Sequence, residues 1–222
     1  MHKKYFGLLI LICMSYNLYP QVNPRQYDEN FMYTVFFDDF NGLDINRNDW
    51  SANSIFRGIG QLIDSSLTYN VDNGKLELTM AQIPGYNEYT DYVGQEFRTN
   101  EEFRYGSFEC KATFANKYGS WPAFWSFHGP GCLNNEGPEI DFAEYFCPVA
   151  NQANKMGHFI HHWICGGGGE VSTDYDDDKY VFLATTNIYK AVWTPDKIDF
   201  YIDNVHKNTY YNNGRIGFHI SR

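Results

Sequence analysis

The sequence lacks several features that mark common protein classes. It has no pair of cysteines with Cys-x-x-Cys spacing, which argues against a zinc site. It has no internal repeat of fixed period and no convincing amphipathic helix longer than a turn or two. Basic residues are few, since 17 Lys and Arg stand against 27 Asp and Glu for a net charge of −10. We therefore expect no nucleic-acid partner and no binding to an anionic membrane surface.

Long hydrophobic runs are also absent, apart from one short run near the N-terminus. Residues 6–14 are apolar and follow Lys3 and Lys4, but this run is too short to span a bilayer as a stable helix. Positive charge before a short apolar run predicts a secretory signal peptide over residues 1–20, with an uncleaved anchor as the alternative. We expect a secreted or periplasmic protein with no membrane contact after cleavage. A polar arm, residues 21–32, then precedes a single domain of residues 33–222.

Cysteine is scarce outside the predicted signal peptide. Cys13 leaves with the signal, and four cysteines remain: Cys110, Cys132, Cys147 and Cys165. An even number in an exported chain predicts two disulfides, with three pairings open. Free buried thiols are the alternative.

Aromatic residues and short alternating runs are abundant. Tyr, Phe and Trp make up 18% of the chain, which suits a β-rich fold and a surface that stacks on flat ligands. Apolar and polar residues alternate over residues 75–80, 107–114 and 197–202, as in strands with one buried face. Turn residues, as at 72–74 and 194–196, separate such runs. The pattern predicts an all-β sandwich of antiparallel strands.

Residues 139–144 are the strongest candidate for a catalytic segment. They read Glu-Ile-Asp-Phe-Ala-Glu, and in a regular strand Glu139 and Asp141 share one face while Glu144 points to the other. One β-bulge around residues 142–143 corrects this parity. All three carboxylates then face one cleft, and the intervening Ile faces the core.

Three carboxylates on one strand face are costly, because neighbouring negative charges raise one another's pKa. A retaining glycosidase needs such an arrangement, with an ionised nucleophile and a protonated acid roughly 5–5.5 Å apart. The two Glu side chains can supply that pair. Asp141 between them can hydrogen-bond the nucleophile and share its proton. An acidic surface strand or a calcium site is the alternative interpretation.

Aromatic and hydrogen-bonding side chains flank this segment. In an extended chain Trp121 and Trp125 share a face about 13 Å apart and could stack on successive sugars, unless both belong to the core. His161 could hydrogen-bond a sugar hydroxyl or the acid pair, or it could be satisfied within the fold. Arg98 could bind a sugar hydroxyl or a substrate anion, with a surface ion pair as the alternative. We expect these four side chains to bind substrate.

Signals for metals and cofactors are weak. The acidic run of residues 174–178 could gather calcium, but such runs are more often solvated loops. Residues 44–55 begin like an EF-hand loop but have Asp49 where Gly belongs and Ile55 where the closing Glu belongs, so we reject that site. We expect no cofactor and no metal for catalysis.

These segments resemble glycoside hydrolase family 16, whose signature is Glu-x-Asp followed by one or two residues and Glu. Residues 139–144 are similar to the longer, bulged form of that signature, which is typical of laminarinases, carrageenases and agarases. Further segments resemble family blocks and stand in family order: residues 37–42, 105–109, 121–125, 193–196 and 200–203.

The resemblance implies a fold, a reaction and a set of roles. The fold is a concanavalin-like β-jelly-roll sandwich of two antiparallel sheets. Glu139 is the nucleophile, Glu144 the general acid/base and Asp141 the helper. The reaction is endo-hydrolysis of a β-linked glycan with retention of configuration.

One departure from the family concerns the C-terminal end. The family's final strand, a Val-Asp-Tyr-Val-Arg-Val-Tyr-like run near a structural calcium, has no counterpart after residues 213–220. Because an unpaired sheet edge costs stability, we expect either a truncated domain or another segment in the gap. Because that strand lies near the structural calcium of the family, the sequence does not decide whether this protein binds a structural calcium.

Three hypotheses for the function follow. The first is hydrolysis of a β-1,3-glucan of the laminarin type, which the acidic net charge favours. The second is the same chemistry on a marine galactan such as agar, carrageenan or porphyran, which Arg98 favours. The third is a non-catalytic carbohydrate-binding module or an inactive fragment, although a binding module need not keep all three carboxylates. We expect the protein to be a monomer.

Overall fold

The protein is described by a computed structural model that covers ten segments of the chain. They are residues 12–13, 34–54, 56–57, 60–88, 90–115, 119–127, 136–145, 157–164, 170–175 and 185–212. Every regular element in these segments is a β-strand, which confirms the predicted all-β class. Within them, no helix has the length and apolar character needed to cross a membrane.

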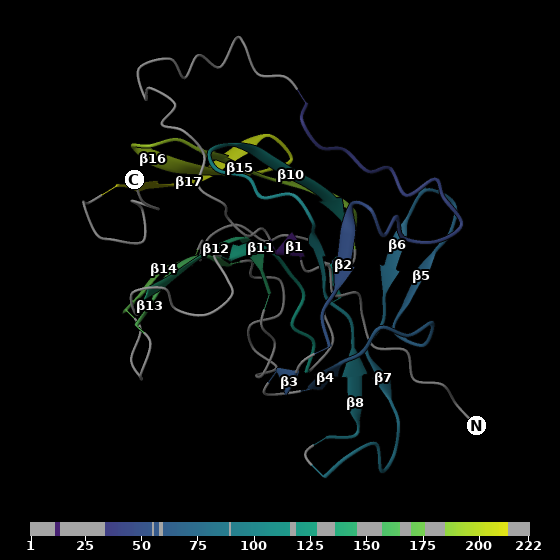
Figure 1. Ribbon diagram of the computed structural model, residues 1–222. Helices are drawn as coiled ribbons and strands as arrows, with labels where there is room; N and C mark the ends of the chain where they lie inside the picture. The colour runs from purple at the N-terminus through teal and green to yellow at the C-terminus, as the bar shows by residue number, and fades with distance from the viewer. Residues whose placement is uncertain are drawn as a thin grey trace.

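Two four-stranded antiparallel sheets form the body of the molecule. The first has the order β10 (Gly106–Ala112), β15 (Asn187–Trp193), β16 (Lys197–Ile202) and β17 (Val205–Tyr211). The second has the order β11 (Ala123–Phe127), β12 (Glu136–Glu144), β13 (Gly157–Ile164) and β14 (Glu170–Tyr175). The first sheet lies above the second in Figure 1.

Shorter strands form three smaller sheets. One contains β1 (Ile12–Cys13), β9 (Phe97–Thr99) and β2 (Trp50–Ala52). Another has the order β3 (Phe56–Arg57), β4 (Gly60–Leu62), β8 (Tyr92–Gly94) and β7 (Ala81–Gln82). The third is the pair β5 (Tyr69–Val71) and β6 (Leu76–Leu78). Two short pairings, β1 with β9 and β4 with β8, are parallel, unlike the antiparallel pairings of the two large sheets.

Strand β1 belongs to the segment that we expect to be a signal peptide. It pairs Ile12 with Phe97 and Cys13 with Arg98, on the edge of β9 that β2 does not occupy. Cleavage after the predicted signal would remove this strand and leave that edge of β9 without the pairing.

The main hydrophobic core lies between the two large sheets. Trp193 and Phe200 from the first sheet pack in one cluster with Phe124 and Phe142 from the second. The alternation read from the sequence is confirmed by the burial of its inward residues: Leu76, Leu78, Phe108, Ala112, Ile198, Phe200 and Ile202. A sandwich with this core fixes the second sheet in place, so that its other face is available for a site.

Cys110 corrects the prediction of two disulfides. Its thiol is free, because the side chain points inward from β10 and packs against the core cluster rather than another cysteine. Burial, with a smaller contribution from Glu109, raises the pKa of the Cys110 thiol to about 12. The other three cysteines, Cys132, Cys147 and Cys165, lie outside the described residues.

Candidate active site

Strand β12 contains a β-bulge at the predicted position. On the β11 side, Trp125 pairs with Asp141 and Phe124 pairs with Ala143, so Phe142 has no counterpart on β11. One extra residue on one strand is the definition of a bulge. The prediction that residues 142–143 interrupt the two-residue period is therefore confirmed.

The β13 side shows the same interruption. Asp141 pairs with Phe159 and Glu144 pairs with Gly157, so three steps along β12 match only two along β13. His158 is the residue of β13 left opposite the bulge. The pairings with β11 and with β13 therefore place the interruption of the two-residue period at the same position in β12.

The bulge sorts the side chains of β12 onto two faces. Ile140, Phe142 and Ala143 are buried in the core cluster between the sheets. Asp141 and Glu144 lie close enough on the other face for the charge of one to act on the other. A regular strand would have turned Glu144 toward the core instead.

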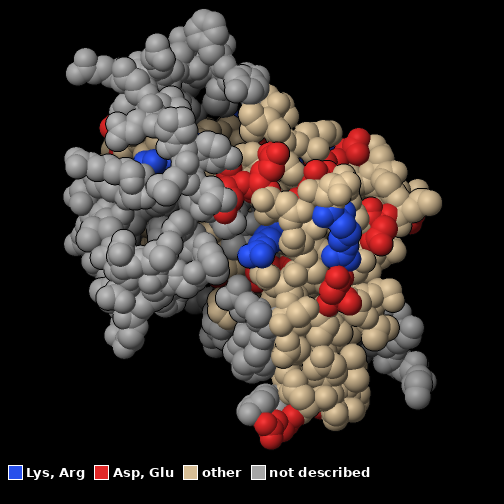
Figure 2. All heavy atoms as spheres, in the orientation of Figure 1, with Lys and Arg blue, Asp and Glu red and all other residues tan. Residues whose placement is uncertain are grey.

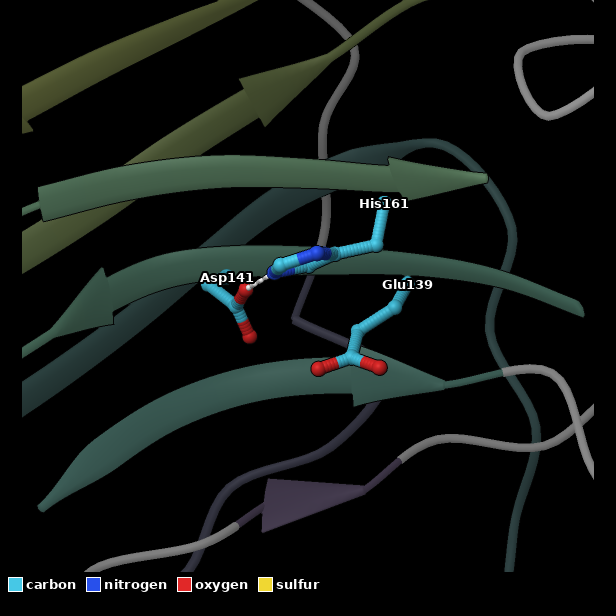
Figure 3. Close-up of side chains that lie close together, drawn as sticks. All are labelled: Glu139, Asp141 and His161. Atoms are coloured by element: carbon cyan, nitrogen blue, oxygen red, sulfur yellow. Dashed lines mark ion pairs between the residues drawn. The ribbon is translucent and has the colours of Figure 1, made fainter. Parts of the chain in front are cut away.

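Glu139, Asp141 and His161 form a compact group on this face. Each offers an oxygen or nitrogen atom, and these atoms lie within 4.8 Å of one another. Figure 3 shows the His161 ring from β13 reaching toward Asp141, with the Glu139 carboxylate beside them. The sequence left the partner of His161 open, and its ring contacts the carboxyl group of Asp141, which lies between the two Glu residues in the sequence.

Asp141 is the most deeply buried member of the group, with 1% of its surface exposed. Its Oδ2 lies 2.9 Å from Nε2 of His161. Burial raises the pKa of Asp141 well above its usual range, and the charge of Glu144 raises it further. Asp141 therefore favours its protonated form more than an exposed aspartate would, and His161 stands at hydrogen-bond distance from that carboxyl group.

Glu144 is held by Trp121, which precedes β11. The indole Nε1–H of Trp121 donates a hydrogen bond to Oε1 of Glu144. Burial raises the pKa of Glu144, while the Trp121 hydrogen bond and the charge of His161 act in the opposite direction. A carboxyl group with a raised pKa stays protonated at higher pH, which is the property that a proton donor needs.

The two tryptophans differ in exposure. Trp121 is 37% exposed, whereas Trp125 is 5% exposed and packs with Ala123 and Phe127. Trp125 lies opposite Asp141, so it borders the site, but most of its ring is covered. Of the two rings, Trp121 offers the larger surface for stacking on a sugar.

Arg98, another predicted substrate-binding residue, sits on β9, in a sheet other than that of the carboxylates, and its side chain is exposed. Among the described contacts of Asp141 and Glu144, none involves Arg98.

One residue near the site was missed by sequence reasoning. The imidazole Nδ1 of His158 lies 2.8 Å from the carbonyl oxygen of Phe142, at the bulge. Strand alternation places His158 on the core face, opposite to the face of His161. The only available signal was that His158 lies one strand away from a predicted bulge, and the pairing register that connects them is not readable from the sequence.

Within the described segments, two places have side chains that suit a cation. The group of Glu139, Asp141 and His161 has the ligand spacing for one, although Asp141 and His161 already contact each other there. An acidic hollow of about 340 Å³ lies between residues 37 and 49, where Asp38 accepts a hydrogen bond from Nε1 of Trp50 at 2.7 Å. The donors in both places are the oxygen and imidazole types that hard or borderline cations prefer.

Comparison with known proteins gives a consistent picture. The profile of glycosyl hydrolases family 16 matches residues 61–219. A β-glucanase of Acetivibrio thermocellus is 27% identical over 178 residues, which are 78% of this chain and 48% of that protein. A keratan-sulfate endo-1,4-beta-galactosidase of Sphingobacterium multivorum is 32% identical over 114 residues, or 48% of this chain and 25% of that protein.

A solved structure shares the fold. The laminarinase from Rhodothermus marinus superimposes with a TM-score of 0.62 at 22% identity, over 81% of this chain and 75% of that chain. This likeness confirms the expected jelly-roll sandwich. The chain spans about half the length of the β-glucanase that it matches. The matched region covers well over half of the chain and includes the bulged carboxylate strand, and the chain therefore belongs to glycosyl hydrolases family 16.

Proposed function

We propose that this protein is a retaining endo-glycoside hydrolase that cleaves β-linkages in a polysaccharide of the β-1,3-glucan, laminarin type. One observation carries the proposal: the bulge in β12 places Glu144 beside Asp141 on the face opposite the core. An arrangement that gathers buried carboxylates costs stability, and acid–base catalysis gives a reason to keep it.

In the proposed mechanism Glu144 is the general acid and Glu139 the nucleophile. Glu144, whose pKa is raised by burial, protonates the oxygen of the leaving sugar. The Glu139 carboxylate attacks the anomeric carbon and forms a glycosyl–enzyme intermediate. Glu144, now ionised, takes a proton from water, and that water releases the sugar with its configuration retained.

Asp141 assists by holding a proton between its neighbours. Its buried carboxyl group lies within reach of both Glu139 and His161. A protonated Asp141 can donate a hydrogen bond to the Glu139 carboxylate, and the charge of the pair then stays low before attack. As the Glu139 charge is consumed, the His161 imidazole offers the same proton a second acceptor.

The acidic character of the chain supports a neutral glycan as substrate. The net charge is −10. On the face shown in Figure 2, acidic side chains are spread around a few basic ones. Such a surface repels sulfated polymers at low ionic strength. The β-glucanase relative and the laminarinase-like fold point the same way.

The second candidate is the same reaction on a galactan such as agar, carrageenan or porphyran. The observation that favours it is the similarity to a keratan-sulfate endo-1,4-beta-galactosidase. A non-catalytic carbohydrate-binding module is less favoured, because all three carboxylates are present on the bulged strand.

Product release from a panel of glycans tests the proposal. The panel contains laminarin, mixed-linkage β-glucan, agarose, carrageenan and keratan sulfate, and a Glu139→Gln variant with wild-type circular dichroism is the control. We expect reducing sugars from laminarin, with the β-anomer formed first by NMR, and none from the variant. Cleavage of only a galactan would establish the second candidate. No release by a folded wild-type protein would favour the binding module.

We also propose that residues 1–20 direct export and that the mature protein is a monomer. The charged and apolar pattern of this segment supports export. Mass spectrometry of the protein from culture medium or periplasm would identify the mature N-terminus. Light scattering of the same sample measures its mass in solution, and a mass twice that of one chain would contradict the monomer.

A further inference from the structure

The bulge in β12 creates a hydrogen-bonding problem in the core. An extra residue loses its ladder partners, and a buried carbonyl group without a partner costs about 1–3 kcal/mol. Phe142 is that residue, and it is fully buried. Bulk water cannot reach its carbonyl oxygen, so a protein group must satisfy it.

His158 supplies the partner. It is the residue of β13 that faces the bulge, because its neighbours Gly157 and Phe159 pair with Glu144 and Asp141. Its Nδ1 lies 2.8 Å from the carbonyl oxygen of Phe142. A carbonyl oxygen can only accept, so Nδ1 carries the proton and donates it.

The imidazole of His158 is itself held in place by the opposite sheet. The side chain is 2% exposed, and its ring stacks on Phe200 of β16 at 4.5 Å with an angle of 19°. The first sheet thus fixes the ring, and the ring fixes the backbone of the second sheet.

The packing of the Phe142 ring does not determine the orientation of the peptide that follows Phe142. The ring of Phe142 stacks on Phe108 at 4.8 Å, which anchors the side chain in the core. The carbonyl group of Phe142 belongs to the peptide between Phe142 and Ala143, so a hydrogen bond to its oxygen fixes the orientation of that peptide. That orientation decides where the chain places Glu144, one residue farther on.

We propose that His158 is a positioning residue for the reaction. The hydrogen bond from its Nδ1 to the Phe142 carbonyl oxygen holds the bulge in the form that sets Glu144 at its working distance from Glu139 and Asp141. The inference rests on the proposed function, since that distance matters for a retaining hydrolase. His158 touches no substrate and transfers no proton in this role.

Two substitutions separate positioning from packing. His158→Leu removes the donor, and His158→Asn places an amide N–H near the position of Nδ1. We expect His158→Leu to lower kcat by roughly 10- to 100-fold with KM changed by less than about threefold, since displacement of about 1 Å costs that much. We expect His158→Asn to keep kcat within about threefold of the wild type.

Thr68→Val is the matched control. Thr68 is fully buried, and its hydroxyl lies 2.8 Å from the carbonyl oxygens of both Ile63 and Ser65, neither of which belongs to β12. Its loss costs a buried side-chain-to-carbonyl hydrogen bond of the same kind. We expect a lower Tm with unchanged kcat. A His158→Leu protein that also loses only Tm and keeps kcat would overturn the proposal.

A measurement without substrate keeps this test apart from the test of the proposed function. Carboxyl ¹³C NMR titration follows the pKa of Glu144, which depends on the burial of this side chain, on its hydrogen bond from Trp121 and on the charge of His161. We expect this pKa to change in His158→Leu and to be kept in His158→Asn, even for a protein that cleaves no glycan. Equal Glu144 titrations in both variants and the wild type would refute the positioning role.

If the His158→Leu variant fails to fold, a third substitution, His158→Gln, still tests the proposal. His158→Gln places its amide one bond farther out than asparagine does. Positioning by Nδ1 predicts that glutamine shifts the Glu144 titration and lowers kcat more than asparagine. The opposite ranking, or no difference between the two, would refute it.

Discussion

Strands β15 and β12 are both central strands of four-stranded sheets, and they follow different rules. Strand β15 pairs without interruption with β10, from Asn187 opposite Ala112 to Trp193 opposite Gly106, and its burial alternates at every residue. The pairing register of strand β12 shifts by one residue at the bulge, relative to both β11 and β13. The regular strand supports the core, whereas the interrupted strand sends two consecutive residues inward and returns an acidic side chain to the open face.

The two sheets also differ in how their charged side chains are paired. On β16, Asp199 meets Lys197 at 2.6 Å. Burial alone would raise the pKa of Asp199, but hydrogen bonds from Lys197 and Thr209 outweigh it and lower the pKa. On β12, burial raises the pKa of Asp141, and the charge of the neighbouring Glu144 raises it further. One sheet pairs its charges for stability, and the other gathers like charges at a cost that a reaction justifies.

Exchanging Ala143 and Glu144 (Ala143→Glu together with Glu144→Ala) moves the carboxylate to a position that the bulge turns inward, and we expect this exchange to have the largest effect. The carboxylate at position 143 would face the core, where an unpaired charge costs several kcal/mol. The proposed acid would also be lost from the cleft. We expect activity to fall by more than about 10⁴-fold, together with a large loss of Tm.

The control for this exchange alters the buried position alone. Ala143→Gly preserves the bulge and removes one buried methyl group, so we expect near-normal kcat and a stability loss of about 1 kcal/mol. Polysaccharide hydrolysis and thermal unfolding measure both variants. An exchange variant that retains more than a few per cent of activity would contradict the role of the bulge.

Glu144→Gln keeps the bulge and removes only the proton donor. We expect kcat on the polysaccharide to fall by roughly 10²–10⁴-fold, the usual contribution of acid–base assistance. Aryl glycosides with good leaving groups need less protonation, so their cleavage should fall less. Glu109→Gln, on the exposed face of β10, is the matched control and should leave both rates unchanged. Equal losses on both types of substrate would argue against Glu144 as the acid.

Asp141→Asn should weaken activity and strengthen the fold. The folded pKa of Asp141 is raised, so stability falls as pH rises from the unfolded value of about 4 through the folded one. Asparagine has no charge to bury. Above that range we expect a gain of about 1–2 kcal/mol, or a Tm higher by roughly 2–8 °C, with kcat lower by about 10²-fold.

Thermal scans across pH check the Asp141 prediction. The stability advantage of Asp141→Asn should vanish below about pH 4, where the wild-type carboxyl group is protonated in both states. A variant that is less stable than the wild type at every pH would show that the contact with His161 outweighs the cost of burial.

The features of the fold and the site that could be predicted from the sequence are those that depend on the residue pattern within one segment. The parity of Glu139, Asp141 and Glu144 within one segment was enough to predict the bulge. The alternation of Ile198, Phe200 and Ile202 was enough to predict a one-sided strand. Both patterns need only the two-residue period of a strand.

The features that were missed depend on contacts between distant segments. Cys110 was predicted to form a disulfide, but the core between the sheets encloses its thiol. His158 faces the bulge only because of the pairing register of β12 and β13. Strand register between segments is set by tertiary packing, which no short stretch of sequence specifies.

Asp199→Asn tests the stabilising side of the comparison and should have the smallest effect. Lys197 is 42% exposed, so solvent screens the pair, and we expect a loss of about 0.2–1 kcal/mol at neutral pH. The folded pKa of Asp199 is lowered, so its contribution is present above the unfolded value of about 4 and is lost as pH falls. Wild type and variant should therefore approach each other in Tm as pH falls below about 4 and in about 1 M salt, with equal kcat throughout. A kcat change in Asp199→Asn would mean that the first sheet, too, contributes charge to the reaction.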